Sequence, residues 1–248
     1  KEATMEEGQR TGREDQGEEG QRIGFVFPTY AYGLPRMVKE FAESFVPPEG
    51  AYIFAVTTCA GIPGKVLKQF NKILKKKKHR LNAGWAVLDP SSSLINDPEK
   101  DGIQRIMISA NKGEKPKTSS ERIDEIAETA KARKDHSLET SNGKTNFIGS
   151  LLYPLAMRSF PDRAADFWVD EGCTGCGICA QICPRDNITL VDGKPQWGND
   201  CEMCHACIQW CPKTAVQYVD LTGDRARYRN TGVSVKEMVL RECVKGSV

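Results

Sequence analysis

Eight of the ten cysteines in this chain fall in two runs that share one spacing, and cysteine thiolates are soft ligands that suit iron. Each run reads C-x-x-C-x-x-C-x-x-x-C-P, the spacing with which proteins hold [4Fe–4S] clusters. Each iron of such a cluster takes one thiolate, so one cluster needs four cysteines and two runs predict two clusters. The first run contains Cys173, Cys176, Cys179 and Cys183, and the second contains Cys201, Cys204, Cys207 and Cys211.

The last cysteine of each run is predicted to serve the cluster of the other run. The close triplet can reach three irons from one tight loop, whereas the fourth cysteine, followed by proline, points away. Cys211 therefore completes the cluster of the first triplet, and Cys183 completes the other. The predicted ligands are Cys173, Cys176, Cys179 and Cys211 for the first cluster, and Cys201, Cys204, Cys207 and Cys183 for the second.

Zinc sites and disulfides are the alternative uses of so many thiols. Zinc modules usually offer two separated C-x-x-C pairs, or cysteine–histidine mixtures, to one ion, and they have no reason to repeat a triplet followed by Cys-Pro. A disulfide framework is favoured even less, because no secretory signal is visible in these residues. The duplicated spacing resembles that of bacterial-type two-cluster ferredoxins, and the resemblance covers about residues 165 to 220.

The composition is that of an ordinary globular protein, with 39% hydrophobic and 27% charged residues among 248. A formal net charge of +2 indicates neither a nucleic acid nor an acidic partner, and no apolar run is long enough to cross a bilayer. Iron–sulfur clusters and free thiols fit a reducing cytoplasm. We therefore expect a cytoplasmic protein with redox proteins as electron donor and acceptor, and with no nucleic-acid or membrane partner.

Strand and helix patterns alternate between residues 23 and 135, which predicts an α/β domain whose parallel sheet is covered on both faces. The strands are expected at residues 23–27, 52–59 and 84–89, and the helices at residues 36–45, 65–80 and 119–135. Ser119 or Ser120 is the expected N-cap of the last helix. Ligands of such sheets bind at the carboxyl ends of the strands, here the loops at residues 28–35 and 57–64.

The remaining residues are expected to form connecting segments and an α+β domain. Residues 1–22 are rich in Glu, Gln, Gly and Arg, which predicts a disordered or connecting segment. Residues 136–165 have weak helical patches and are expected to pack the two domains together through Leu151, Leu152, Leu155 and Met157. The ferredoxin domain is expected at residues 166–220 with a hairpin turning at Asp192-Gly193, and an extension at residues 221–248 with a helix from about Ser234.

Two features have competing interpretations. His205 follows a cluster cysteine and is expected to be an exposed histidine, with protonation-linked tuning of the second cluster as the alternative. The lysine run at residues 75–78 is expected to be a solvated helix end that the helix dipole favours, with a docking patch for an acidic partner as the alternative.

The order of these segments, and several phrases within them, resemble the EFR1 family of flavodoxin–ferredoxin fusions over about residues 23 to 240. The phrases are IGFVFPTYAYGLP, FAVTTCAG, CTGCGICAQICP, CEMCHACIQWCP and RYRN. The resemblance implies a flavodoxin-like domain at residues 23–135 that binds FMN. It also implies that two loops flank the flavin ring, one with Thr29, Tyr30 and Tyr32 and the other with Thr58, Cys59 and Gly61.

The chain departs from the flavodoxin pattern at its beginning. Flavodoxins hold the FMN phosphate with a Thr/Ser- and Gly-rich loop after the first strand, and nothing before Ile23 resembles that strand or loop. We expect the first strands to lie upstream; the alternatives are that another chain supplies them or that FMN binding is lost. The predicted function is electron transfer by two clusters coupled to FMN. The alternatives are a flavin-dependent reductase fed by its own ferredoxin domain and a cluster-bearing interaction subunit.

Overall fold

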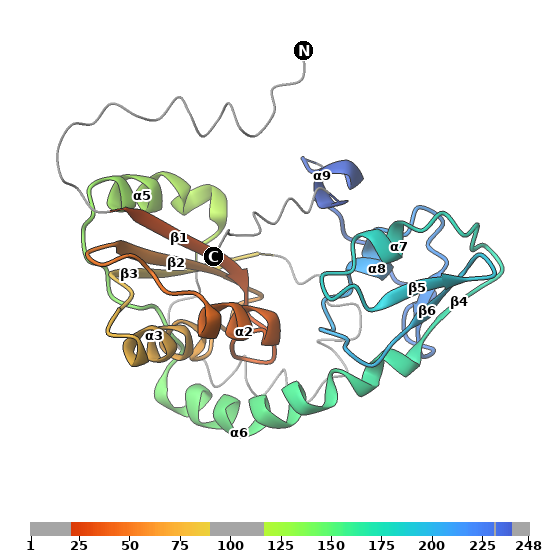
Figure 1. Cartoon of the computed structure of the whole chain (residues 1–248), viewed down its shortest axis with the longest axis horizontal. Helices are drawn as coiled ribbons and strands as arrows, with labels where there is room; N and C mark the ends of the chain where they lie inside the picture. The colour runs from red at the N-terminus through yellow and green to blue at the C-terminus, as the bar shows by residue number, and fades with distance from the viewer. Residues whose placement is uncertain (1–20, 90–116, 231, 240–248) are drawn as a thin grey trace, which may run out of the picture.

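The computed structural model describes residues 21–89, 117–230 and 232–239, which form two lobes (Figure 1). The N-terminal lobe contains a parallel sheet with helices, and the C-terminal lobe contains the clustered cysteines and two small antiparallel sheets. The disordered or connecting segment predicted at residues 1–22 lies, up to residue 20, outside the described residues, as does the end of the predicted extension from residue 240. Within the described ranges, no helix is both long enough and apolar enough to cross a membrane.

Three parallel strands form the N-terminal sheet, in the order β1 (Arg22–Pro28), β2 (Tyr52–Cys59) and β3 (Ala83–Leu88). The predicted parallel α/β sheet is thereby confirmed, and each strand ends within one residue of its expected position. In the register, Phe25 faces Ala55 and Ala55 faces Gly84. The outer edge of β1 pairs with no strand among the described residues, and Val26 on this strand is 74% exposed.

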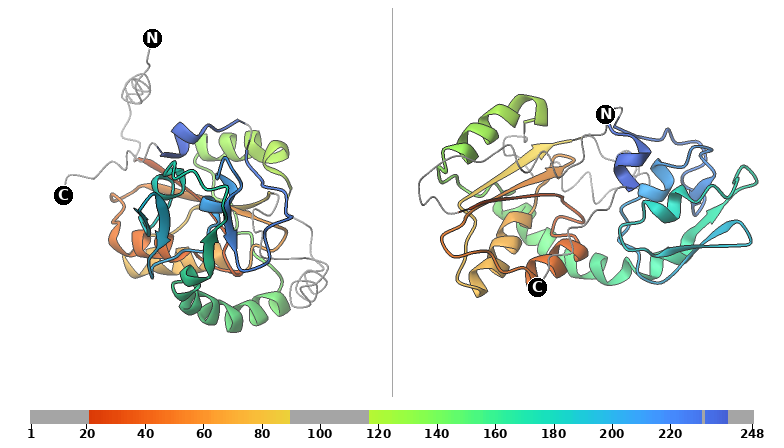
Figure 2. Two further views of the ribbon diagram at one scale, coloured as in Figure 1. Left: turned by 90° about the vertical axis from the view of Figure 1, so that its right-hand side faces the viewer. Right: turned by 45° about the horizontal axis from the view of Figure 1, so that its top comes forward.

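Helices cover both faces of the sheet (Figure 2). Helices α2 (Arg36–Ser44) and α3 (Val66–Lys76) pack on one face, where Phe70 is fully buried and its ring centroid lies 4.8 Å from that of Phe25. Helix α5 (Ser119–Lys131) packs on the other face, where Ile126 joins the fully buried Trp85. The apolar residues of the strands thus have partners on both sides, as fully apolar strands require.

Helix α3 ends four residues earlier than predicted, because the chain turns at Lys78, whose φ is 64°. The preceding Lys77 donates hydrogen bonds from its amino group to the carbonyl oxygens of Ala42, Glu43 and Phe45, at 2.9, 2.6 and 2.7 Å. Carbonyl groups at the end of a helix lack hydrogen-bond donors within the helix, and the Lys77 amino group is the donor for those at the end of α2. The expectation that the whole lysine run is a solvated helix end is therefore wrong for Lys77.

Helix α5 begins after Thr118, so the predicted caps Ser119 and Ser120 are wrong. Thr118 and Glu121 form a capping box, in which the Glu121 carboxylate accepts a hydrogen bond from the Thr118 amide at 2.7 Å. The Thr-x-x-Glu spacing that permits this exchange is present only from Thr118. The helix also ends at Lys131, four residues before the predicted end, and Arg133 has a positive φ of 51°.

The connecting segment contains a longer helix than its weak pattern predicts. Helix α6 (Gly143–Ser159) begins at Asn142, whose side chain accepts a hydrogen bond from the Thr145 amide at 3.0 Å, and it passes beneath both lobes in Figure 1. Its contacts with the N-terminal lobe include Tyr153, whose hydroxyl donates to the Leu34 carbonyl at 2.6 Å, and Ser150, whose hydroxyl accepts from the Lys65 amino group at 2.9 Å. Of the leucines expected to pack there, Leu151 is 60% exposed and Leu155 is 68% exposed.

The C-terminal lobe repeats one order of elements twice, which the duplicated cysteine runs predict. A strand, a cysteine loop and a one-turn helix occur in each half, and the second strand of the first half forms a hairpin with the first strand of the second. The elements are β4 (Phe167–Val169), α7 (Ile178–Gln181), β5 (Ile188–Val191), β6 (Lys194–Trp197), α8 (Ala206–Gln209) and β7 (Val216–Tyr218), preceded by the 3₁₀ turn η1 (Asp162–Asp166).

Both small sheets are antiparallel. Strand β4 pairs with β7, and β5 pairs with β6 through a turn at Asp192 and Gly193, whose φ values are 49° and 72°. Two successive positive φ values are typical of a type I′ turn, so the predicted hairpin is confirmed. The extension includes helix α9 (Val235–Val239), which begins after Ser234 as expected, and the Ser234 side chain accepts a hydrogen bond from the Glu237 amide at 3.2 Å.

Candidate iron–sulfur sites

The structure brings the eight clustered cysteines together in two groups of four. A cavity that we call the first site is lined by Cys173, Cys176, Cys179 and Cys211. A second cavity, the second site, is lined by Cys183, Cys201, Cys204 and Cys207. In each group the triplet of one run meets the last cysteine of the other run. Such an exchange lets each short loop present three thiols while the distant fourth thiol closes the cavity.

Backbone turns with positive φ place the triplets around their cavities. In the first loop Gly175 and Gly177 have φ values of 69° and 76°. The second loop has the same turns at the equivalent positions, where Met203 and His205 have φ values of 52° and 59°. Residues other than glycine, asparagine and aspartate rarely adopt a positive φ, because each such residue costs about 1–2 kcal/mol. The backbone path is thus repeated although the glycines are not.

Backbone N–H groups point at sulfur in the second site. The Met203 amide donates to Cys201 Sγ at 3.3 Å, and the Asn187 amide donates to Cys183 Sγ at 3.4 Å. Hydrogen bonds to ligand sulfurs stabilise negative charge and tune the reduction potential of a bound cluster. In the first site, the Lys194 amino group lies next to the ligand loop and donates to the Cys173 carbonyl at 3.0 Å.

Burial makes the free thiols poor acids. It raises the pKa of Cys204 to about 12 and that of Cys179 to about 11. At neutral pH these thiols would therefore stay protonated unless a metal replaced the proton, and thiolate-bound metals do so readily. The donor set of each site, four soft sulfur atoms within an apolar lobe, fits a [4Fe–4S] cluster.

The arrangement of the thiols does not suit one zinc ion. Such an ion needs four ligands, with each sulfur about 2.3 Å from the metal. In the part of the chain that the structure describes, no three side chains of His, Cys, Asp or Glu are grouped to hold a single metal ion. The nine cysteines in that part are also all free thiols. Each cavity is thus lined by four free thiols that are not grouped to hold one ion.

His205 is buried in the second site and is not the exposed histidine expected from the sequence. Its side chain is 5% exposed, and burial lowers its pKa to about 4. The imidazole is therefore neutral at physiological pH. Its Nε2 atom has no hydrogen-bond partner among the described residues.

The strand-end residues assigned to a flavin lie at neighbouring ends of β1 and β2. The Thr29 amide donates to the Thr58 carbonyl at 2.8 Å, and the Thr29 and Thr57 hydroxyls lie 2.9 Å apart. Gly61 has a φ of 102° and open space where a side chain would project, so its backbone can be approached closely. Cys59 is buried, and burial raises its pKa to about 11, which makes its thiol a poor nucleophile.

Tyr30 and Tyr32 have different surroundings although they belong to one loop. Burial and the nearby Cys204 and Glu202 raise the pKa of Tyr30 well above its usual range, so Tyr30 lies next to the second site. Tyr32 has a φ of 67°, and its carbonyl lies next to Gly64. Neither cavity of the C-terminal lobe includes a residue of these two loops.

Replacing Gly64 by alanine should destabilise this pair of loops. A Cβ atom at Gly64 would lie 2.0 Å from the Tyr32 carbonyl oxygen, and the φ of Gly64 is 60°. We expect Gly64→Ala to lower the free energy of unfolding by about 1–3 kcal/mol, measured as a fall in the thermal midpoint. The matched variant is Gly143→Ala at the start of α6, where a Cβ atom meets nothing within 4 Å. An equal loss in both variants would contradict the close approach of Gly64 to Tyr32.

Charged residues between the lobes are functional candidates that the sequence analysis missed. Arg36 at the start of α2 pairs with Asp200 at 2.5 Å, and Arg185 pairs with both Asp200 and Glu40. Asp200 and Arg185 each lie within two residues of a cysteine of the second site. We call Arg36, Glu40, Arg185 and Asp200 the interlobe ion network. In the sequence they look like ordinary surface charges, because their partners are about 145 to 165 residues away.

Asp200 of the interlobe ion network stays charged at neutral pH. Burial acts to raise the pKa of Asp200, but hydrogen bonds from Arg36 and Arg185 outweigh burial and hold this pKa below its ordinary value. A carboxyl group with a lowered pKa in the folded state contributes stability that is fully present above the ordinary pKa of about 3.9. That contribution disappears as the pH falls through the lowered pKa.

Comparison with known families finds an iron–sulfur match in the first cysteine run. Residues 167–189 match the 4Fe-4S binding domain family, Fer4. The match contains the complete first run, from Cys173 to Cys183, and ends before the second run. A search of curated proteins finds no match to the chain. The chain therefore has a 4Fe–4S binding domain in its cysteine-rich C-terminal lobe, preceded by a parallel α/β sheet.

Proposed function

We propose that this chain transfers electrons through two [4Fe–4S] clusters, one in each four-cysteine site. The observation that supports the proposal most directly is the grouping of four thiols around each of two cavities, with one thiol exchanged between the runs. When bound, such clusters supply one-electron transfer at low potential. Cys173, Cys176, Cys179 and Cys211 would hold one cluster, and Cys183, Cys201, Cys204 and Cys207 the other.

The protein would contribute ligands, spacing and exclusion of water. Ile182, Ile208 and Val216 are 3%, 0% and 2% exposed and form an apolar wall within the cysteine lobe. The Trp197 ring stacks on Phe167 with centroids 5.6 Å apart, and both residues line the second site. An apolar wall lowers the local dielectric and thereby affects the reduction potential of a bound cluster.

The exchanged cysteines would also hold the two clusters at a constant separation. Cys183 follows α7 of the first half and reaches the second site, whereas Cys211 follows α8 of the second half and reaches the first. The two one-turn helices therefore lie between the sites. Electrons can pass between clusters only over short distances, so a rigid connection suits electron transfer.

The iron and sulfide content tests the proposal. We expect anaerobically prepared protein to contain about eight iron and eight sulfide per chain, the content of two clusters, and to give a paramagnetic spectrum when reduced. About two zinc per chain without sulfide would contradict the proposed function. About four iron and four sulfide would leave one cluster, and the missing one would then be located by the cysteine variants described below.

We further propose that the N-terminal lobe couples the clusters to FMN at the ends of β1 and β2. The support is the family resemblance, the adjacent hydroxyls of Thr29 and Thr57 and the open approach to Gly61. Tyr30, Tyr32, Thr58 and Cys59 complete the two loops in this proposal. Flavin released from purified protein and identified by mass spectrometry tests it, and its absence from protein that retains both clusters would contradict it. Redox proteins of unassigned identity are the proposed donor and acceptor.

A further inference from the structure

We propose that the interlobe ion network and Glu202 fix the second site against the N-terminal lobe, which makes it the inner of the two cluster sites and leaves the first site as the outer one. This inference rests on the proposed function, because it concerns the order of the two sites in an electron path. The network residues are positioning residues: they act on the second site through its loop and through their charges. In the transfer considered, one electron moves from one cluster to the other and no bond forms or breaks.

The network connects α2 of the N-terminal lobe directly to the loop of the second site. Arg36 donates to Asp200 Oδ1 at 2.5 Å and to the carbonyl of the site cysteine Cys201 at 3.1 Å. From the other side, Arg185 donates to Asp200 Oδ2 at 2.8 Å through Nε and to Glu40 at 2.5 Å. Arg36 and Arg185 are 20% and 18% exposed, so their charges are shielded from water more than those of an ordinary surface pair.

Glu202 makes a second connection at the same place. It is 2% exposed and directly follows Cys201, and its carboxylate accepts a hydrogen bond from the Met37 amide at 3.3 Å. Met37 is in the first turn of α2, where amide groups lack helical partners and carboxylates are stabilised. A carboxylate that belongs to the loop of the second site therefore caps a helix of the other lobe.

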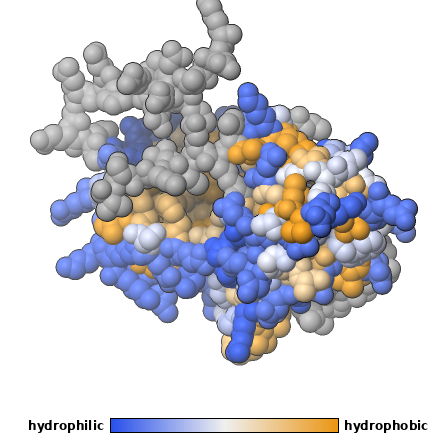
Figure 3. Space-filling model, turned by 45° about the vertical axis from the view of Figure 1, so that its right-hand side comes forward, coloured by the Kyte–Doolittle hydropathy of each residue, from blue (hydrophilic) through white to orange (hydrophobic). Residues whose placement is uncertain are grey.

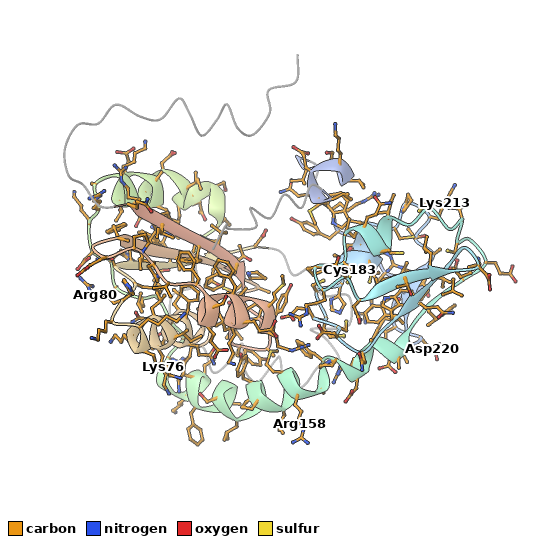
Figure 4. The ribbon with its side chains drawn as sticks, viewed as in Figure 1. Lys76, Arg80, Arg158, Cys183, Lys213 and Asp220 are labelled. Atoms are coloured by element: carbon orange, nitrogen blue, oxygen red, sulfur yellow. The ribbon has the colours of Figure 1, made fainter. Side chains whose placement is uncertain are left out.

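The second site faces the carboxyl edge of the sheet. At that edge the ends of β1 and β2 are joined by the Thr29 amide, which donates to the Thr58 carbonyl at 2.8 Å, and Tyr30 directly follows Thr29. In Figures 1 and 4 the strand arrows end on the side of the C-terminal lobe, and Cys183 lies on the side of that lobe nearer to them. Ligands of parallel α/β sheets bind at this edge, so a cofactor there would have the second site as its nearer neighbour.

The first site has the opposite environment. Its cysteine Cys176 is exposed. Two exposed lysines are next to this site: Lys194 bonds to the Cys173 carbonyl, and Lys213 lines the cavity. Lys213 projects on the far side of the C-terminal lobe from the sheet in Figure 4. When that lobe is turned forward in Figure 3, its surface mixes hydrophilic and apolar residues. The hydrogen bonds given above for the interlobe ion network connect α2 to Cys201 and to residues next to the cysteines of the second site.

The reduction potential of each cluster tests this assignment, because reduction adds negative charge that a nearby cation stabilises. Arg36→Gln removes a cation beside the second site and keeps a hydrogen-bonding side chain. We expect the ratio of reduced to oxidised cluster at a fixed applied potential to fall about tenfold for the second site and to stay unchanged for the first. Lys194→Gln should give the reverse pattern, with the shift confined to the first site.

Single-cluster variants make the two potentials separable. Cys176→Ala is expected to leave only the cluster of the second site, and Cys204→Ala only that of the first. Each charge variant is introduced into both backgrounds, and the paramagnetic signal of the reduced cluster is titrated against potential. Arg36→Lys should restore most of the potential, because it keeps the positive charge. Arg80→Gln is the matched control, since Arg80 pairs with Asp135 on the N-terminal lobe at 2.8 Å, away from both sites in Figure 4.

The inner–outer assignment is supported if Arg36→Gln shifts the second site alone and Arg80→Gln shifts neither. It is overturned if Arg36→Gln shifts both sites equally, shifts the first site alone or has no effect while iron is retained. An iron-free unsubstituted protein would overturn the proposed function together with this inference. The iron content of the unsubstituted chain therefore distinguishes failure of the function from failure of the inference alone.

Discussion

The Cys211→Ala variant is expected to lose the cluster of the first site and to keep the cluster of the second. Cys211 is 9% exposed and lines the first cavity with Cys173, Cys176 and Cys179, although it lies 32 residues beyond Cys179 in the sequence. A cluster with three thiolates and a buried apolar methyl group in place of the fourth lacks a ligand for one iron. We expect iron and sulfide to fall from about eight to about four each per chain.

The reciprocal variant locates the other exchanged ligand. Cys183→Ala should lose the cluster of the second site, and its remaining paramagnetic signal should differ from that of Cys211→Ala. Cys59→Ala is the control, because Cys59 is a buried thiol at the end of β2, outside both cavities, and should retain both clusters. If Cys211→Ala and Cys204→Ala leave the same signal, Cys211 binds the cluster of the second triplet and the exchange is wrong.

The Phe70→Ala variant is expected to destabilise the N-terminal lobe by about 3–5 kcal/mol. Phe70 is fully buried, and its ring centroid lies 4.8 Å from that of Phe25 and 5.2 Å from that of Phe27. Truncation removes the ring and leaves a cavity between α3 and the sheet that the strands cannot close without losing their register. A loss of this size is a large part of the stability of a typical domain.

Hydrogen exchange of the β2 amides is the appropriate measurement, because a two-lobe protein with cofactors need not unfold in one step. Phe147→Ala is the matched control, since Phe147 on α6 is 64% exposed and should change the stability by no more than about 0.5 kcal/mol. Similar exchange rates in the two variants would contradict the packing of α3 on the sheet.

The elements with strong local patterns were predictable. The three parallel strands follow from apolar runs, and the hairpin follows from Asp192 and Gly193, whose residue types tolerate positive φ. Helix ends were less predictable. Thr118 caps α5 in place of Ser119 or Ser120. Helix α3 ends at Lys76 because the chain turns at Lys78, and Lys77 bonds to carbonyls at the end of α2, over 30 residues away in the sequence.

Burial was the least predictable property of single side chains. His205 has the polar character of a surface residue, yet the second loop repeats the backbone turns of the first and encloses it. Leu151 and Leu155 have the apolar character of core residues, yet they face outward on α6 while Tyr153 makes the contact with Leu34. A residue type indicates a preference for burial, whereas the packing of neighbouring elements decides it.

The amino-acid sequence by itself determined which residues can bind iron, because the soft thiolates and their close spacing are local properties of each run. Only the tertiary structure decided which of the two sites is bonded to the N-terminal lobe. That choice depends on Arg36 meeting Asp200 across 164 residues and on Glu202 capping α2, and no local pattern encodes a partner so far away. Charges become partners only when folding has placed the lobes side by side and removed much of the water between them.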